Sequence, residues 1–134
     1  MILIDANIIM YAAGAAHRYK QPSARLLERV ASGEVEALID AELLQEILHR
    51  YRAIGRWPDG RQVYDLARQI FPTVVAITAE ILDRARELLD EYDSMMARDA
   101  LHAAVVLTEG LEAICSYDRD FDGIVGLRRI EPYV

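Results

Sequence analysis

The sequence predicts a three-layer α/β/α fold, in which helices cover both faces of a central, mostly parallel sheet of four to five strands. Short apolar runs alternate along the chain with longer segments whose apolar residues recur at helical spacing. That alternation is typical of parallel α/β folds rather than of sandwiches or bundles. The 134 residues suit one domain, and 53% apolar residues can fill its core. Because no repeat or linker divides the chain, residues 1–134 are expected to form a single domain.

The strands are predicted where short apolar runs end at polar or turn-forming residues. The first run, residues 2–4, is uninterrupted and leads directly into Asp5, which indicates a strand buried on both faces. Four further strands are expected at residues 35–39, 73–77, 113–116 and 127–130.

The helices are predicted from apolar spacing and from their end signals. Asp40 is a good N-cap, Pro22 suits a first turn, and Thr78 opens a long helix. The last helix is apolar nearly all round, which predicts that it is buried. The expected helices are residues 7–11, 23–31, 41–53, 62–70, 78–92 and 98–110. The segment 55–60, with its Trp-Pro-Asp-Gly sequence, is expected to be a loop.

Composition restricts the possible partners and the location. The formal net charge of −7 argues against nucleic acid, unless a divalent metal neutralises part of the acidic charge. Of the 15 basic residues only Lys20 is a lysine, and arginine suits bidentate phosphate recognition. A single cysteine, Cys115, fits a reducing cytosol. No apolar run is long enough to span a membrane and no signal peptide is evident, so a cytoplasmic protein is expected.

Four acids stand at the boundaries between predicted elements: Asp5, Glu46, Asp99 and Asp118. In a parallel sheet, the carboxyl ends of strands and the starts of the following helices meet along one edge, so these carboxylates are expected to converge. Oxygen-only ligands suit a hard divalent ion, which in turn supports hydrolysis of a phosphodiester. The alternative is that each acid merely caps a helix or turn.

Several neighbouring polar residues have supporting or ambiguous roles. Asn7 and Ser116 can orient a carboxylate or a water, although both residue types also cap helices and form turns. His49 and His102 each follow an acid by three residues; one could support the site, although a satisfied, half-buried histidine is the more common case. Two further acids, Asp120 and Asp122, leave the fourth ligand open, with Asp118 preferred because it comes first after the strand.

Four motifs together resemble those of the PIN-domain ribonucleases, and within them the VapC-type toxins of type II toxin–antitoxin pairs. The resemblance covers nearly the whole chain. The motifs are Ile4-Asp5-Ala6-Asn7, Glu42-Leu43-Leu44-Gln45-Glu46-Ile47, Arg98-Asp99-Ala100-Leu101-His102-Ala103-Ala104 and Ser116-Tyr117-Asp118-Arg119-Asp120-Phe121-Asp122.

The resemblance implies an endonuclease that cleaves single-stranded RNA with Mg²⁺ or Mn²⁺, acts as a toxin, forms a homodimer and is blocked by a small antitoxin protein. It assigns metal binding and catalysis to four acids and supporting roles to two polar residues, of which Ser116 replaces the threonine more common in the family. The acids are Asp5, Glu46, Asp99 and Asp118; the supporting residues are Asn7 and Ser116.

The same residues allow three other interpretations. A phosphoacceptor receiver domain needs a lysine near its late strands, whereas Lys20 lies early in the chain. A haloacid-dehalogenase-type phosphatase needs a second aspartate at position 7, where this chain has Asn7. A non-catalytic PIN-like scaffold that binds a protein partner remains the alternative, since sequence cannot show turnover.

Overall fold

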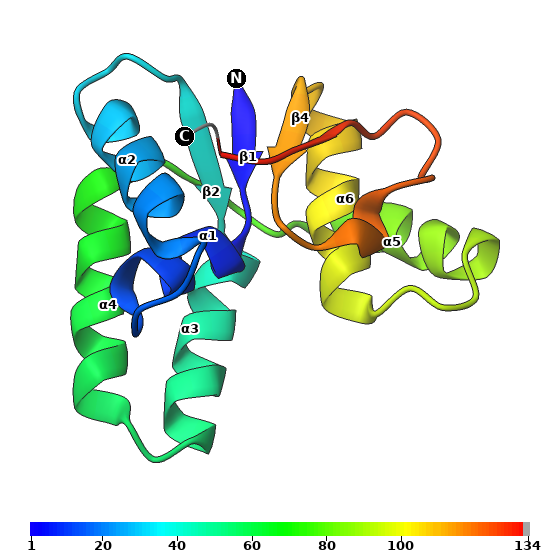
Figure 1. The fold of residues 1–134 in the computed structure, drawn as a ribbon. Coiled ribbons are helices and arrows are strands. Elements are labelled where there is room, and N and C mark those ends of the chain that lie inside the picture. Colours follow the sequence, from blue (N-terminus) through cyan, green and yellow to red (C-terminus); the bar gives the residue numbers. More distant parts are fainter. Residues whose placement is uncertain (133–134) are drawn as a thin grey trace.

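A five-stranded parallel sheet forms the middle layer of the computed structural model, which describes residues 1–132 (Figure 1). The strands follow the order β3-β2-β1-β4-β5, and every neighbouring pair is parallel. They are β1 (Ile2–Ile4), β2 (Ala37–Asp40), β3 (Val74–Val75), β4 (Ala113–Cys115) and β5 (Arg129–Ile130). The predicted fold class is therefore confirmed.

Six α-helices cover the two faces of this sheet. In Figure 1, α1 to α4 lie on one side of the strands, and α5 and α6 lie on the other. The helices are α1 (Ala6–Ala13), α2 (Lys20–Ala31), α3 (Ala41–Ala53), α4 (Trp57–Ile70), α5 (Ala79–Glu91) and α6 (Ala97–Glu109), and a short 3₁₀ helix, η1 (Arg119–Phe121), follows β4. Within residues 1–132, no helix is both long enough and apolar enough to cross a lipid bilayer.

The central strand β1 shows why the sheet is buried on both faces. Successive side chains of a strand point to opposite faces. Leu3 accordingly packs into the core formed with α5 and α6, whereas Ile4 packs into the core formed with α1 to α4. Both side chains are fully buried. Because β1 lies between β2 and β4, residue 5 emerges at the middle of the sheet's carboxyl edge.

The buried helix predicted near the end of the chain is also confirmed. Ala100, Ala103 and Ala104 on α6 are fully buried, and their small side chains allow α6 to pack closely against the sheet and α5. The helix ends at Gly110, whose φ of 66° lies in the left-handed region that favours glycine.

The prediction of a loop at residues 55–60 is wrong, because α4 already begins at Trp57. The same residues that form turns also begin helices: a proline occupies the first turn, and Asp59 places an acid there. Gly60 is needed for packing, since a Cβ atom at this position would lie 2.4 Å from Cβ of Tyr51 on α3. Smaller differences are that α2 begins earlier, at Lys20, and that β3 is only two residues long.

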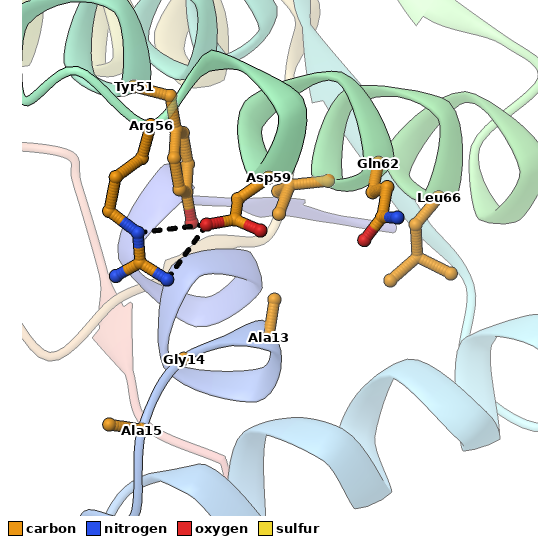
Figure 2. A pocket seen from close by; sticks show the side chains of 9 residues that line it. Ala13, Gly14, Ala15, Tyr51, Arg56, Asp59, Gln62 and Leu66 are labelled. Carbon is orange, nitrogen blue, oxygen red and sulfur yellow. Dashed lines mark hydrogen bonds and ion pairs between the residues drawn. The ribbon is translucent and has the colours of Figure 1, made fainter.

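A cavity of about 450 Å³ lies between the end of α1 and the α3–α4 pair (Figure 2). Its one acid, Asp59, is already paired with Arg56, whose Nε donates a hydrogen bond of 2.8 Å to the carboxylate. This cavity therefore offers no carboxylate free to hold a metal ion.

Candidate metal centre

A smaller cavity, of about 340 Å³, lies at the carboxyl edge of the sheet. All four predicted acids line it, and they come from the end of β1, from α3, from the first turn of α6 and from the segment after β4. They are Asp5, Glu46, Asp99 and Asp118. Residues far apart in sequence thus meet here, as the parallel topology predicts.

Asp5 is held in one orientation by three interactions. Its backbone N–H donates to the carbonyl of Cys115 on β4, at 3.0 Å, which joins the two strand ends. Its Oδ1 accepts from the N–H of Ala6, at 2.7 Å, and so caps α1. Its Oδ2 accepts from the hydroxyl of Ser116, at 2.6 Å. The capping role considered for Asp5 is real, but it uses only one of the two oxygens.

Ser116 connects Asp5 to the rest of the site. Besides donating to Asp5, its Oγ accepts from Nδ2 of Asn7 at 3.0 Å and from the backbone N–H of Asp118 at 2.9 Å. A hydroxyl has one donor and two acceptor positions, so all are used. The side chain is fully buried, and the network fixes both Asp5 and the start of the Asp118 segment.

Glu46 is held by a buried histidine. His102 on α6 is completely buried; its Nε2 lies 2.7 Å from Oε1 of Glu46 and 3.7 Å from Oδ1 of Asp5. Its Nδ1 lies 2.6 Å from Oδ2 of Asp40, which is also fully buried. The other oxygen of Asp40 caps α3 by accepting from the N–H of Leu43, at 2.9 Å.

The charge of His102 follows from these contacts. Each ring nitrogen faces a carboxylate oxygen, so each must carry a proton to form a hydrogen bond, and the ring is an imidazolium. Burial by itself lowers the pKa of His102, but the charge of Asp40 and the hydrogen bonds to Asp40 and Glu46 outweigh it, so that the pKa lies well above 6.5. This half of the site therefore contains its own cation.

The other acids form a second, more open group. Single oxygens of Asp99, Asp118 and Asp120 lie within 4.8 Å of one another. Burial raises the pKa of Asp99 to about 6, and the charges of Asp118 and Asp5 contribute to this rise. The charges of His102 and Arg98 oppose this rise but do not cancel it.

The two acids left open by the sequence have different surroundings. Asp120 joins Asp99 and Asp118, and its backbone N–H donates to Oδ1 of Asp118 at 2.9 Å. Asp122 instead pairs with Arg129, whose Nε lies 2.8 Å from Oδ1, and the hydrogen bond from Arg129 lowers the pKa of Asp122. Asp122 is therefore engaged elsewhere, whereas Asp120 is available to the site.

The residues present fit a hard divalent cation. The open donors are carboxylate oxygens, the ligands that Mg²⁺ and Mn²⁺ prefer. Oδ1 of Asn7 is buried at the same cavity and has no hydrogen-bond partner among residues 1–132. A buried acceptor normally has a partner, so this oxygen is consistent with a cation or a metal-bound water nearby. Burial is the main cause of the raised pKa of Asp99, and a cation would offset the smaller part that comes from the charges of Asp118 and Asp5.

The structure corrects the expectation of half-buried histidines. His102 is completely buried and bonded to two carboxylates, whereas His49 is exposed at the rim of the cavity. Sequence reasoning identified Asp40 as a helix cap but missed its contact with His102, because 62 residues separate the two. It also missed Arg50 and Arg98, which line the cavity beside the acids.

Comparisons with known proteins agree with this geometry. The PIN domain family matches residues 2–127. Ribonuclease VapC13 of Mycobacterium tuberculosis is 41% identical over 130 residues, which cover 97% of this chain and 99% of that protein. Ribonuclease VapC23 of the same species is 31% identical over 121 residues, which cover 88% and 93% of the two chains.

Two solved structures have the same fold at low identity. VapBC2 from Rickettsia felis, bound to a DNA fragment from its promoter, superposes with a TM-score of 0.75 at 17% identity, covering 98% of both chains. VapC20 of M. tuberculosis, a Sarcin-Ricin loop cleaving toxin, gives a TM-score of 0.68 at 19% identity, covering 90% of this chain and 92% of that one. The chain therefore belongs to the PIN domain family and, by its identity to VapC13 and VapC23, to the VapC group within it.

Proposed function

We propose that this protein is a metal-dependent endoribonuclease that cleaves single-stranded regions of RNA. The observation that carries the proposal is the convergence of four carboxylates, from four separate elements, on one cavity. The 41% identity to a protein named a ribonuclease, over almost the whole of both chains, supports the same chemistry. The match to the PIN domain family spans residues 2–127, so we propose that the activity belongs to a single domain of residues 1–134.

The metal ligands proposed are Asp5, Glu46, Asp99 and Asp118, and the ion proposed is Mg²⁺ or Mn²⁺. When bound, such an ion lowers the pKa of a coordinated water and stabilises charge on the phosphate. The protein's own contribution is orientation. Ser116 fixes Asp5, His102 fixes Glu46, and Asn7 supports Ser116 by donating a hydrogen bond to its hydroxyl.

We further propose that the protein acts in the cytoplasm as the toxin of a toxin–antitoxin pair, as a homodimer inhibited by a cognate antitoxin protein. One solved structure of this fold, from Klebsiella pneumoniae, is named a toxin–antitoxin complex. A short reading frame next to the gene, whose product co-purifies with this chain and suppresses cleavage, would support this part. Growth unaffected by expression of the chain alone would contradict it.

The nuclease activity can be tested with Asp99→Ala and Asp5→Ala. Each should reduce Mg²⁺-dependent cleavage of single-stranded RNA by at least about a hundredfold, since ligand loss exceeds the 10- to 100-fold effect of outer residues. EDTA should abolish cleavage by the wild type. Asp83→Ala, which removes an exposed acid on α5, is the matched control and should cleave normally.

Full activity of folded Asp5→Ala and Asp99→Ala would contradict the assignment. The alternative, a non-catalytic PIN-like scaffold that binds a protein partner, predicts no cleavage by the wild type at any Mg²⁺ or Mn²⁺ concentration, together with unchanged partner binding in both variants.

A further inference from the structure

We propose that the part of the metal cavity farther along α3 is a nucleotide subsite, in which Arg50 and Arg98 contact RNA phosphates next to the cleaved one. An apolar wall formed by Met10 and Ile54 of the same cavity would take the adjoining base. This inference rests on the proposed function, because it assigns a place to the substrate of that reaction.

One face of α3 forms a continuous wall of the cavity. Residues three and four apart lie on the same side of a helix. Glu46 is followed at this spacing by His49 and Arg50, and then by Ala53 and Ile54, and all five line the cavity. At 1.5 Å per residue the wall extends about 12 Å beyond the acid. Stacked nucleotides rise about 3.4 Å each, so there is room for more than one.

Another part of the cavity wall comes from α1. Ala6, Asn7 and Met10 share one side of that helix and line the same cavity. Met10 on α1 and Ile54 at the end of α3 supply apolar surface; Ile54 is 51% exposed. Apolar surface of this kind suits the face of a base, and its preference among bases follows how strongly each base packs against it.

The two arginines give this cavity a local positive rim in an acidic protein. Arg50 and Arg98 are exposed, come from different helices, and form no ion pair with any residue in the described range 1–132. By contrast Arg56 is held by Asp59. A planar guanidinium beside a metal site is suited to bidentate phosphate contacts. The rim therefore explains how a chain of net charge −7 could hold a polyanion.

An acidic peptide is the other occupant with complementary charge. RNA is favoured because the same cavity combines the arginines with the four carboxylates and with an apolar wall. A metal-neutralised acidic floor accepts a phosphodiester, whereas it gives no advantage to a carboxylate-rich peptide.

The test measures kcat and KM for Mg²⁺-dependent cleavage of a short single-stranded RNA by Arg50→Ala and Arg98→Ala. Each should raise KM roughly tenfold and change kcat much less. Each should also reduce the slope of log(kcat/KM) against log(salt) by about 0.7, the value for one lost phosphate contact on a single strand.

Two arginines serve as matched controls. Arg52→Ala removes an exposed arginine two positions along α3, whose guanidinium lies over the ring of Trp57 instead. Arg86→Ala removes an exposed arginine on α5 that is paired with Asp90. Both should retain the wild-type KM and salt slope. For the apolar wall, Ile54→Ala should change the relative cleavage rates of substrates that differ in the adjoining base.

The outcomes separate this subsite from the function itself. If the wild type cleaves RNA but Arg50→Ala and Arg98→Ala match the controls, the subsite is wrong and the nuclease stands. If the wild type does not cleave RNA, the nuclease proposal fails. The subsite is then tested by fluorescence anisotropy, which measures the binding of labelled RNA in EDTA by the wild type and the two variants. Weaker binding of RNA by both variants would support the subsite, and binding equal to that of the wild type would overturn it.

The peptide alternative has its own outcome. If Arg50→Ala and Arg98→Ala lose binding to a polyglutamate peptide while their RNA kinetics are unchanged, the RNA subsite is also overturned. Unchanged base preference in Ile54→Ala would overturn the apolar wall.

Discussion

The two halves of the acidic site are built in different ways. Around Asp5 and Glu46, the protein itself satisfies the carboxylates with a buried imidazolium and a buried hydroxyl. Around Asp99 and Asp118, carboxylates lie together with an exposed third acid, and the pKa of Asp99 rises to about 6 mainly through burial. We call the first group, Asp5 and Glu46 with His102 and Ser116, the braced half. We call the second group, Asp99, Asp118 and Asp120, the open half.

This difference suggests that one half of the site positions carboxylates and the other half provides charge for binding a cation. Buried charges are tolerated only when they are paired and hydrogen-bonded, so the braced half fixes the fold of α3 against α6 as well as the geometry of Glu46. The open half contributes negative charge that costs stability until a cation arrives. Loss of a supporting side chain in the braced half should therefore destabilise the fold, whereas changes in the open half should weaken metal binding without destabilising the metal-free protein.

The largest effect is expected for His102→Gln. Glutamine cannot bridge Asp40 and Glu46, and it leaves a fully buried carboxylate without its cation. Breaking a buried pair in this way costs about 3 to 5 kcal/mol of unfolding free energy. Urea unfolding would measure the loss. Mn²⁺ affinity, measured by calorimetry on the folded fraction, should fall by about 10- to 100-fold because an outer support of Glu46 is gone.

His49→Gln is the control for this variant, since it makes the same chemical change at an exposed position of the cavity rim. It should leave the urea midpoint unchanged. Equal midpoints for the two variants would show that the braced half contributes nothing to the fold.

A smaller and opposite effect is expected for Asp99→Asn in EDTA. Between pH 3.8 and about 6 the folded protein binds more protons at Asp99 than the unfolded chain does. The stability of the wild type should therefore fall as the pH rises through this interval. Asparagine removes that dependence, so above pH 6 the metal-free variant should be more stable by about 1 kcal/mol, allowing for partial exposure. Thermal unfolding across the interval would measure this.

Saturating Mg²⁺ should reverse the order, because the wild type gains about 2.7 kcal/mol at a hundred times its dissociation constant and the variant gains less. Asp93→Asn, at an exposed position before α6, is the control and should retain the wild-type pH dependence. If Asp99→Asn instead destabilises the metal-free protein, the role of Asp99 is to stabilise the helix start.

A loss of stability smaller than that of His102→Gln is expected for Ser116→Ala, which removes one neutral hydroxyl from the braced half. The loss leaves Oδ2 of Asp5 without its donor and should cost about 1 to 2 kcal/mol of stability. Mn²⁺ affinity should fall about tenfold. Ser116→Thr keeps the hydroxyl and should restore the affinity; failure of this rescue would assign the effect to packing alone.

Much of the fold and part of the site were predictable from local signals. An uninterrupted apolar run such as residues 2–4 predicts a strand covered on both faces. Asp40 predicts the start of α3, because aspartate is a good N-cap. The prediction of a loop at residues 55–60 was wrong because proline, aspartate and glycine are common both in turns and at the starts of helices. Only the packing of Gly60 against Tyr51 distinguishes the two.

The sequence by itself determined the layer architecture and the placing of four acids at element boundaries, because hydrophobic periodicity and capping act over a few residues. Tertiary structure decided which of these groups are braced and which are open. The contacts that matter join Ser116 to Asp5 across 111 positions and His102 to Asp40 across 62. No local pattern encodes such contacts, since they arise only when the parallel strands bring their carboxyl ends to one edge.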